Sequence, residues 1–106
     1  MQTQYIQVVT TINSKDAADK LAFDIAEMRL AACVQVEGPI KSTYWWKGKL
    51  ETDEEYRCVF KTKGWLYDLL EASIKKLHTY DTPEILVFQI IQGNSQYFEW
   101  MDQELD

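Results

Sequence analysis

The sequence predicts an α+β fold of the ferredoxin-like, split β-α-β type, in which an antiparallel sheet carries both main helices on one face. Two observations support it. Strand-like and helical segments follow one another in the order β-α-β-β-α-β-α, and a Lys47-Gly48 turn joins two of the strands into a long hairpin. The chain has 106 residues, enough for one hydrophobic core, so we expect a single domain over residues 1–106.

The first strand and the first helix have clear local signals. Residues 5–12 are rich in β-branched side chains, which favours a strand. Every second residue of this predicted strand is expected to face the core, namely Ile6, Val8, Thr10 and Ile12. Asn13 or Ser14 then offers a helix N-cap, and apolar residues recur at helical spacing as far as about Arg29.

The long hairpin is predicted from residues 33–46 and 50–62. Gly38-Pro39 interrupts the first of these strands, which must therefore bend. The register pairs apolar or oppositely charged residues: Trp46 with Lys49, Trp45 with Leu50, and Lys41 with Glu54. At about 3.3 Å per residue the hairpin reaches about 40 Å, further than a domain of this size covers, so its tip needs another partner.

The second half of the chain contains a helix, a strand and a last helix. Gly64 begins a helix that ends near His78, and Pro83 then disfavours helix. Residues 84–91 form an almost continuous apolar run, typical of an interior strand covered on both faces. Residues 95–105 have the spacing of a short helix. The helix-free sheet face is left exposed, and assembly into a closed oligomer would cover it.

The composition excludes several classes of function. With 17 acidic and 11 basic residues the formal net charge is −6, which disfavours binding to nucleic acid or to an anionic membrane. No apolar run approaches the roughly 18 residues of a membrane span, and the first residues lack a basic segment and a cleavage site, so we expect a cytoplasmic protein. In that compartment Cys33 and Cys58 are expected to be free thiols.

Three motifs follow one another in the sequence: Ala31-Ala32-Cys33-Val34, Tyr44-Trp45-Trp46-Lys47-Gly48-Lys49 and His78-x-Tyr80-x-x-Pro83-Glu84. In this combination they resemble the CutA family of divalent-cation tolerance proteins, and the resemblance covers essentially the whole chain. The resemblance implies a homotrimer similar to the PII-type signalling proteins, with long hairpins that pack against neighbouring subunits. It also implies a non-catalytic role in tolerance of copper and other divalent cations, and some members bind copper.

The sequence departs from the family pattern at a few positions. Thr79 and Gln35 replace a proline and an asparagine that are usual there, and both changes are tolerable. Thr10 and Ser73 stand where some members carry cysteines. A copper site that depends on those two thiols is therefore not expected in this chain.

The candidate metal ligands are few and distant in sequence. The chain has two cysteines and one histidine, and no segment contains a chelating motif. With the family in mind, we expect Cys33, His78 and Glu84 to converge near a subunit boundary and to bind Cu(II) or another divalent cation weakly. Two structural alternatives remain open: Cys33 as a small buried residue, and His78 as a residue that interacts with the helix C-terminus.

Other residues have predicted roles in a cleft or at an interface. Lys61, Tyr80 and Asp81 would line an intersubunit cleft, and an alternative function is a PII-like signalling module that binds a small metabolite there. No nucleophile and base lie at a recognisable spacing, so we do not expect an enzyme. The residues expected at the trimer interface are Tyr44, Trp45 and Trp46. The acidic run of residues 51–55 is expected to be solvated.

Overall fold

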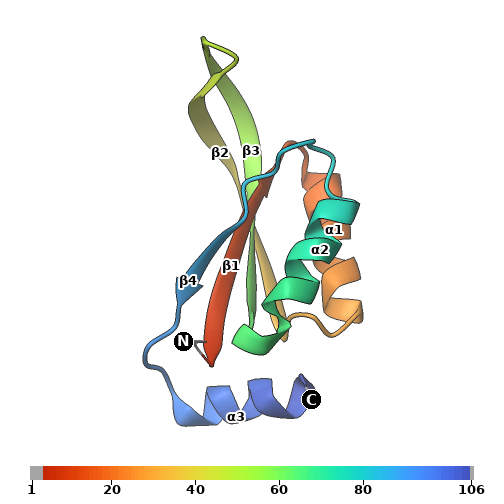
Figure 1. Cartoon of the computed structure of the whole chain (residues 1–106), viewed down its shortest axis with the longest axis vertical. Helices are drawn as coiled ribbons and strands as arrows, with labels where there is room; N and C mark the ends of the chain where they lie inside the picture. Colours follow the sequence, from red (N-terminus) through yellow and green to blue (C-terminus); the bar gives the residue numbers. More distant parts are fainter. Residues whose placement is uncertain (1–3, 106) are drawn as a thin grey trace.

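The computed structural model describes residues 4–105 and confirms the α+β plan. Within these residues one antiparallel sheet has the order β2-β3-β1-β4, and α1 and α2 lie together on one of its faces (Figure 1). The elements in chain order are β1 (Tyr5–Ile12), α1 (Lys15–Glu27), β2 (Cys33–Trp46), β3 (Lys49–Lys63), the 3₁₀ turn η1 (Gly64–Leu66), α2 (Tyr67–Leu77), β4 (Leu86–Gln89) and α3 (Ser95–Glu104).

The core lies between the sheet and the two main helices. The predicted inner face of β1 is confirmed, because all four of its residues are almost fully buried. Ser14 caps α1, with its Oγ accepting a hydrogen bond from the Ala17 amide at 3.1 Å. The helices contribute Leu21 and Ile25 of α1 and Leu70 and Ile74 of α2 to this core.

The predicted hairpin register is confirmed, including the pair of Trp45 with Leu50. The ladder is irregular between Glu37 and Ile40, which is where the sequence required a bend. The last residue pair between β1 and β3 is Ile12 with Tyr56, so residues 40–55 pair only within the hairpin. We call residues 40–55 the arm. The arm projects beyond the rest of the molecule (Figure 1), and the longest dimension of the whole chain, with the arm included, is 44 Å.

The prediction that residues 84–91 form an interior strand is wrong. The strand is shorter, residues 86–89, and it lies at an edge of the sheet, where it pairs only with β1. Leu86, Val87 and Phe88 are each exposed by about half in the single chain. The apolar run therefore predicted a strand correctly, but the expected cover on both faces is not present in the single chain.

Helix α3 lies across one end of the sheet (Figure 1). Met101 and Leu105 anchor it, because both are buried in the core cluster. Asp102 accepts hydrogen bonds from the Lys63 ammonium at 2.6 Å and from the Tyr5 hydroxyl at 3.0 Å, and Lys63 lowers the pKa of Asp102. The helix is thus attached to both central strands of the sheet.

Candidate functional site

His78 is buried at the end of α2, with 9% of its surface exposed. Its Nδ1 accepts a hydrogen bond from the Tyr80 amide at 3.0 Å, so the ring proton is on Nε2, which donates to the Thr11 carbonyl at 2.8 Å. The pairing between β1 and β4 ends at Val9 and Leu86, so β4 offers no amide to the carbonyl of Thr11, two residues further along β1. The imidazole of His78 supplies this hydrogen-bond donor instead. Burial lowers the pKa of His78, which favours the neutral ring.

Tyr80 connects this histidine to the base of the arm. Its hydroxyl donates to Glu55 Oε2 at 2.8 Å, and its ring centroid is 4.8 Å from that of His78. Burial, together with the Glu55 carboxylate, raises the pKa of Tyr80. The expectation that the whole acidic run is solvated is therefore wrong at Glu55, which is only 7% exposed. No local pattern could identify it, because its partner is 25 residues away.

The arm carries a second tyrosine–carboxylate pair further out. The Tyr44 hydroxyl donates to the Asp53 carboxylate, and this hydrogen bond raises the pKa of Tyr44 to about 12. Trp45 and Trp46 are 72% and 50% exposed, and Lys47 Nζ lies 5.6 Å from the Trp46 ring centroid. Their role at a trimer interface stays a prediction, since a single chain leaves these aromatics without cover.

Cys33 lies at a different part of the sheet from His78. It pairs with Lys61, which in turn pairs with Gln7, four residues along β1 from Thr11. At about 3.3 Å per residue, Gln7, which lies level with Cys33, and Thr11, which contacts His78, are about 13 Å apart along β1. Two ligands of one metal ion must lie much closer together than this. Among residues 4–105, no group of three or more His, Cys, Asp and Glu side chains is placed to hold a metal ion.

The surroundings of Cys33 include α3. The Cys33 thiol is half-buried, and burial, followed by the electrostatic effect of this thiol, raises the pKa of Tyr97. Lys61 Nζ lies 5.9 Å from the Tyr97 ring centroid. The other thiol, Cys58, is fully buried and packs in the core, as expected, and burial raises its pKa to about 11.

The remaining predicted site residues are in the segment that leads from α2 into β4. Asp81 and Glu84 are exposed, and within the described chain neither forms a hydrogen bond or ion pair through its side chain. One chain therefore groups His78 and Tyr80 near this segment and leaves Cys33 and Lys61 elsewhere. A metal site or a metabolite cleft that uses both groups stays a prediction about an assembly of chains.

We expect substitution of His78 by alanine to lower the free energy of unfolding by about 1–3 kcal/mol, because the Thr11 carbonyl and the Tyr80 amide lose their partners. His78 has a lowered pKa, so the unfolded chain binds more protons near pH 6. Its contribution is complete above the unfolded value of about 6.5 and is lost as the pH falls below it. Urea unfolding at pH 7.5 and 5.5, at one protein concentration, measures this loss.

The matched control is His78→Gln, which can donate to the Thr11 carbonyl and does not titrate. Because the chain has only one histidine, the difference between wild type and this control measures the titration of the His78 imidazole. It should lose less stability than wild type between the two pH values. Equal losses in both proteins would contradict the assignment.

No helix within residues 4–105 is long and apolar enough to cross a membrane.

A family model described as CutA1 divalent ion tolerance protein matches residues 6–104. Over 96 residues the chain is 42% identical to "Protein CutA 1, chloroplastic" of Oryza sativa, and this alignment covers 91% of this chain and 54% of the rice protein. It is 35% identical to the divalent-cation tolerance protein CutA of Thermus thermophilus, over 89% of this chain and 91% of that protein.

The chain thus spans about half the length of the plant protein and most of the Thermus protein. The crystal structure of CutA1 from Oryza sativa has the same fold, with a TM-score of 0.94 and 38% identity, and the match covers 99% of this chain and 96% of that one. The similarity therefore extends to the projecting arm and to α3.

Proposed function

Because the chain belongs to the CutA1 divalent ion tolerance family, we propose that it binds divalent cations, copper among them, and acts as a homotrimer in divalent-cation tolerance. The observation that carries this proposal is the family match, which includes nearly every element of the fold. The proposed role is non-catalytic, since the only histidine is held by two backbone hydrogen bonds. The proposed compartment is the cytoplasm, whose reducing conditions would keep Cys33 and Cys58 as free thiols.

Two uncovered regions support the trimer. The β4 edge exposes Leu86 and Phe88, and the arm exposes Trp45, Trp46 and Leu50. Large exposed apolar patches commonly mark interfaces. The free edges, β2 and β4, are on opposite sides of one sheet. Joining these unlike edges head to tail gives a ring when the rotation between subunits closes, and we propose a closed, PII-like ring of three chains.

The same arrangement supports a metal site shared between subunits. Cys33 begins β2, whereas His78 and Glu84 precede β4. When β2 of one subunit faces β4 of the next, ligands that are far apart in one chain can approach one another from two chains. Nδ1 is the ring atom of His78 with a free electron pair for a metal, so metal binding there must displace the Tyr80 amide.

Calorimetric titration with Cu(II) tests the site. Cys33→Ala and His78→Ala should each weaken binding at least about tenfold, which is ~1.4 kcal/mol, because each removes one ligand. The matched control is Cys58→Ala, which removes a fully buried thiol outside the proposed site and should leave the affinity unchanged. Undiminished binding in both Cys33→Ala and His78→Ala would refute the site, even if the protein still bound copper.

A further inference from the structure

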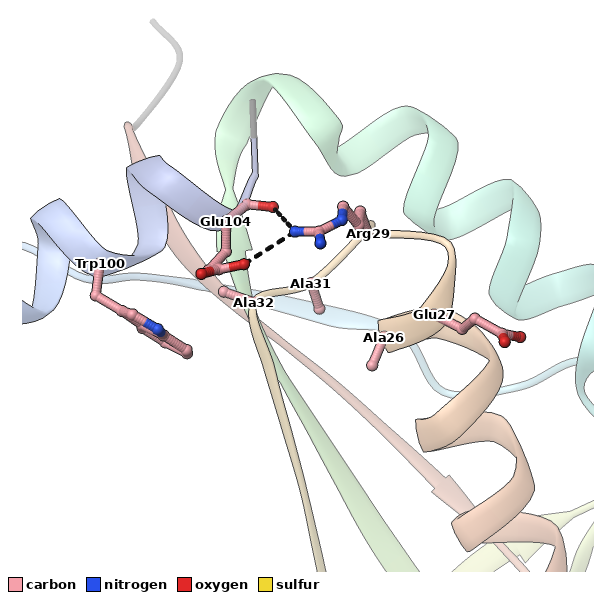
Figure 2. A pocket seen from close by; sticks show the side chains of 7 residues that line it. All are labelled: Ala26, Glu27, Arg29, Ala31, Ala32, Trp100 and Glu104. Carbon is pink, nitrogen blue, oxygen red and sulfur yellow. Dashed lines mark hydrogen bonds and ion pairs between the residues drawn. The ribbon is translucent and has the colours of Figure 1, made fainter.

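An open pocket between α1 and α3 offers no free charge to a ligand. It has a volume of about 440 Å³ and is lined by the end of α1, the residues that lead into β2, and α3 (Figure 2). Arg29 Nη1 donates to the main-chain carbonyl of Glu104 at 2.8 Å and to its carboxylate at 2.9 Å. In Figure 2 the Glu27 carboxylate points away from Trp100. The charged groups at this pocket are therefore paired with each other or directed away from it.

Tyr80, by contrast, is held at two points by groups from distant parts of the fold. Its hydroxyl donates to Glu55 Oε2 at 2.8 Å, and its amide donates to His78 Nδ1 at 3.0 Å. Within residues 4–105 these are the only hydrogen bonds of the segment 79–85, which connects α2 to β4. This segment crosses the molecule at the level where the arm leaves the sheet (Figure 1). One residue therefore ties it both to the end of α2 and to the base of the arm.

Glu55 depends on the contact with Tyr80. It is the last residue of the arm, where it pairs with Ile40, and only 7% of its surface is exposed. Within the part of the chain that the structure describes, Glu55 forms no ion pair, and the Tyr80 hydroxyl is the only group that donates to its side chain. Leaving a buried carboxylate without its donor is unfavourable. The carboxylate therefore holds the tyrosine against the arm.

The amide of Tyr80 occupies the one lone pair of the His78 ring. Nε2 carries the ring proton and donates to the Thr11 carbonyl, so Nδ1 is the ring atom that can accept a hydrogen bond or bind another group. A group that binds Nδ1 must first displace the Tyr80 amide. Because the same residue also reaches Glu55, this displacement disturbs the contact with the arm.

We propose that Tyr80 is a latch that couples His78 to the arm. While Glu55 holds the hydroxyl, the amide covers Nδ1 of His78, and loss of either contact weakens the other. The position of the arm, which carries the exposed tryptophans, then controls whether His78 can bind another group. For a metal ion this consequence rests on the proposed function, whereas the latch itself is tested without metal.

Hydrogen exchange of the residue 80 amide and the ¹⁵N signal of His78 Nδ1 test the latch at pH 7.5. The chain has one histidine, so its ring signals are unambiguous. Tyr80→Phe removes only the hydroxyl, and the amide should exchange at least about tenfold faster, because a hydrogen bond to a charged group is lost. The Nδ1 signal should move toward that of a ring nitrogen without a hydrogen bond. Glu55→Gln, which keeps a weaker acceptor, should give smaller changes of the same sign.

The matched control is Tyr44→Phe, which removes the other tyrosine–carboxylate hydrogen bond of the arm, to Asp53. It should leave the exchange rate and the Nδ1 signal unchanged. An unchanged rate and signal in Tyr80→Phe, or equal changes in the control, would overturn the proposal. If Tyr80→Phe does not fold, Glu55→Gln decides in the same way. A wild type that binds no Cu(II) would refute the proposed function but not the latch, since both measurements are made without metal.

Discussion

Replacing Trp45 and Trp46 together with alanine should convert the proposed trimer into single chains or strongly destabilise it. The arm pairs only within itself, and an isolated two-stranded hairpin is marginally stable in water. Truncating a tryptophan that anchors an interface commonly costs about 2 kcal/mol or more, so the double variant should lose at least about 2 kcal/mol of association free energy per subunit. Light scattering should show the mass falling from that of three chains to 12.5 kDa.

The matched control is Trp65→Ala in η1. This indole is 57% exposed, comparable with the arm tryptophans, but it lies outside the arm. It should leave the mass unchanged. If the double variant remained a stable trimer and lost ligand binding, the aromatics would be a ligand-stacking platform and the interface assignment would be wrong.

Gly38→Ala should lower the free energy of unfolding by about 2–6 kcal/mol. Gly38 has a φ of +147°, a backbone conformation that residues with a side chain rarely adopt. Holding an alanine in it would cost about 1–3 kcal/mol of backbone strain. A Cβ there would be 2.7 Å from Tyr56 Cδ2 and 3.1 Å from the Glu55 carbonyl, and such overpacking costs about 1–3 kcal/mol more. Denaturant unfolding measures the loss.

Gly48→Ala separates the steric part of this effect from the backbone part. Gly48 also has a positive φ, +78°, but a Cβ there would meet no atom within 4 Å. Gly48→Ala should therefore lower the free energy of unfolding only by the cost of holding an alanine in the left-handed conformation, about 1–2 kcal/mol. If the two variants lost the same stability, contact with Tyr56 would not explain why Gly38 is required.

The parts of the fold that were predicted correctly depend on neighbours in sequence. The inner face of β1 follows from two-residue alternation, and the Ser14 cap follows from one side chain beside a helix start. The hairpin register follows from a two-residue turn, because the turn determines every pair beyond it. The error at β4 has the opposite origin. An apolar strand can be covered by its own helices or by another chain, and composition does not distinguish the two.

The candidate site was predictable only in part. The His78 segment was identified from its motif, but the two hydrogen bonds of the ring depend on where β4 stops pairing with β1. Glu55 was missed because its burial depends on Tyr80, a distant residue. The pocket beside Trp100 was not predicted, since its lining comes from two segments that are far apart in the sequence, residues 26–32 and residues 100–104.

By itself the sequence determined the order and type of the elements, the hairpin register and the resemblance to a family, because these depend on short-range periodicity, turn chemistry and linear motifs. The tertiary structure decided which strand is at the edge, that Cys33 and His78 are separated in one chain, and that Glu55 is buried. These properties depend on distances between residues that are far apart along the chain, and such distances exist only after the sheet has formed.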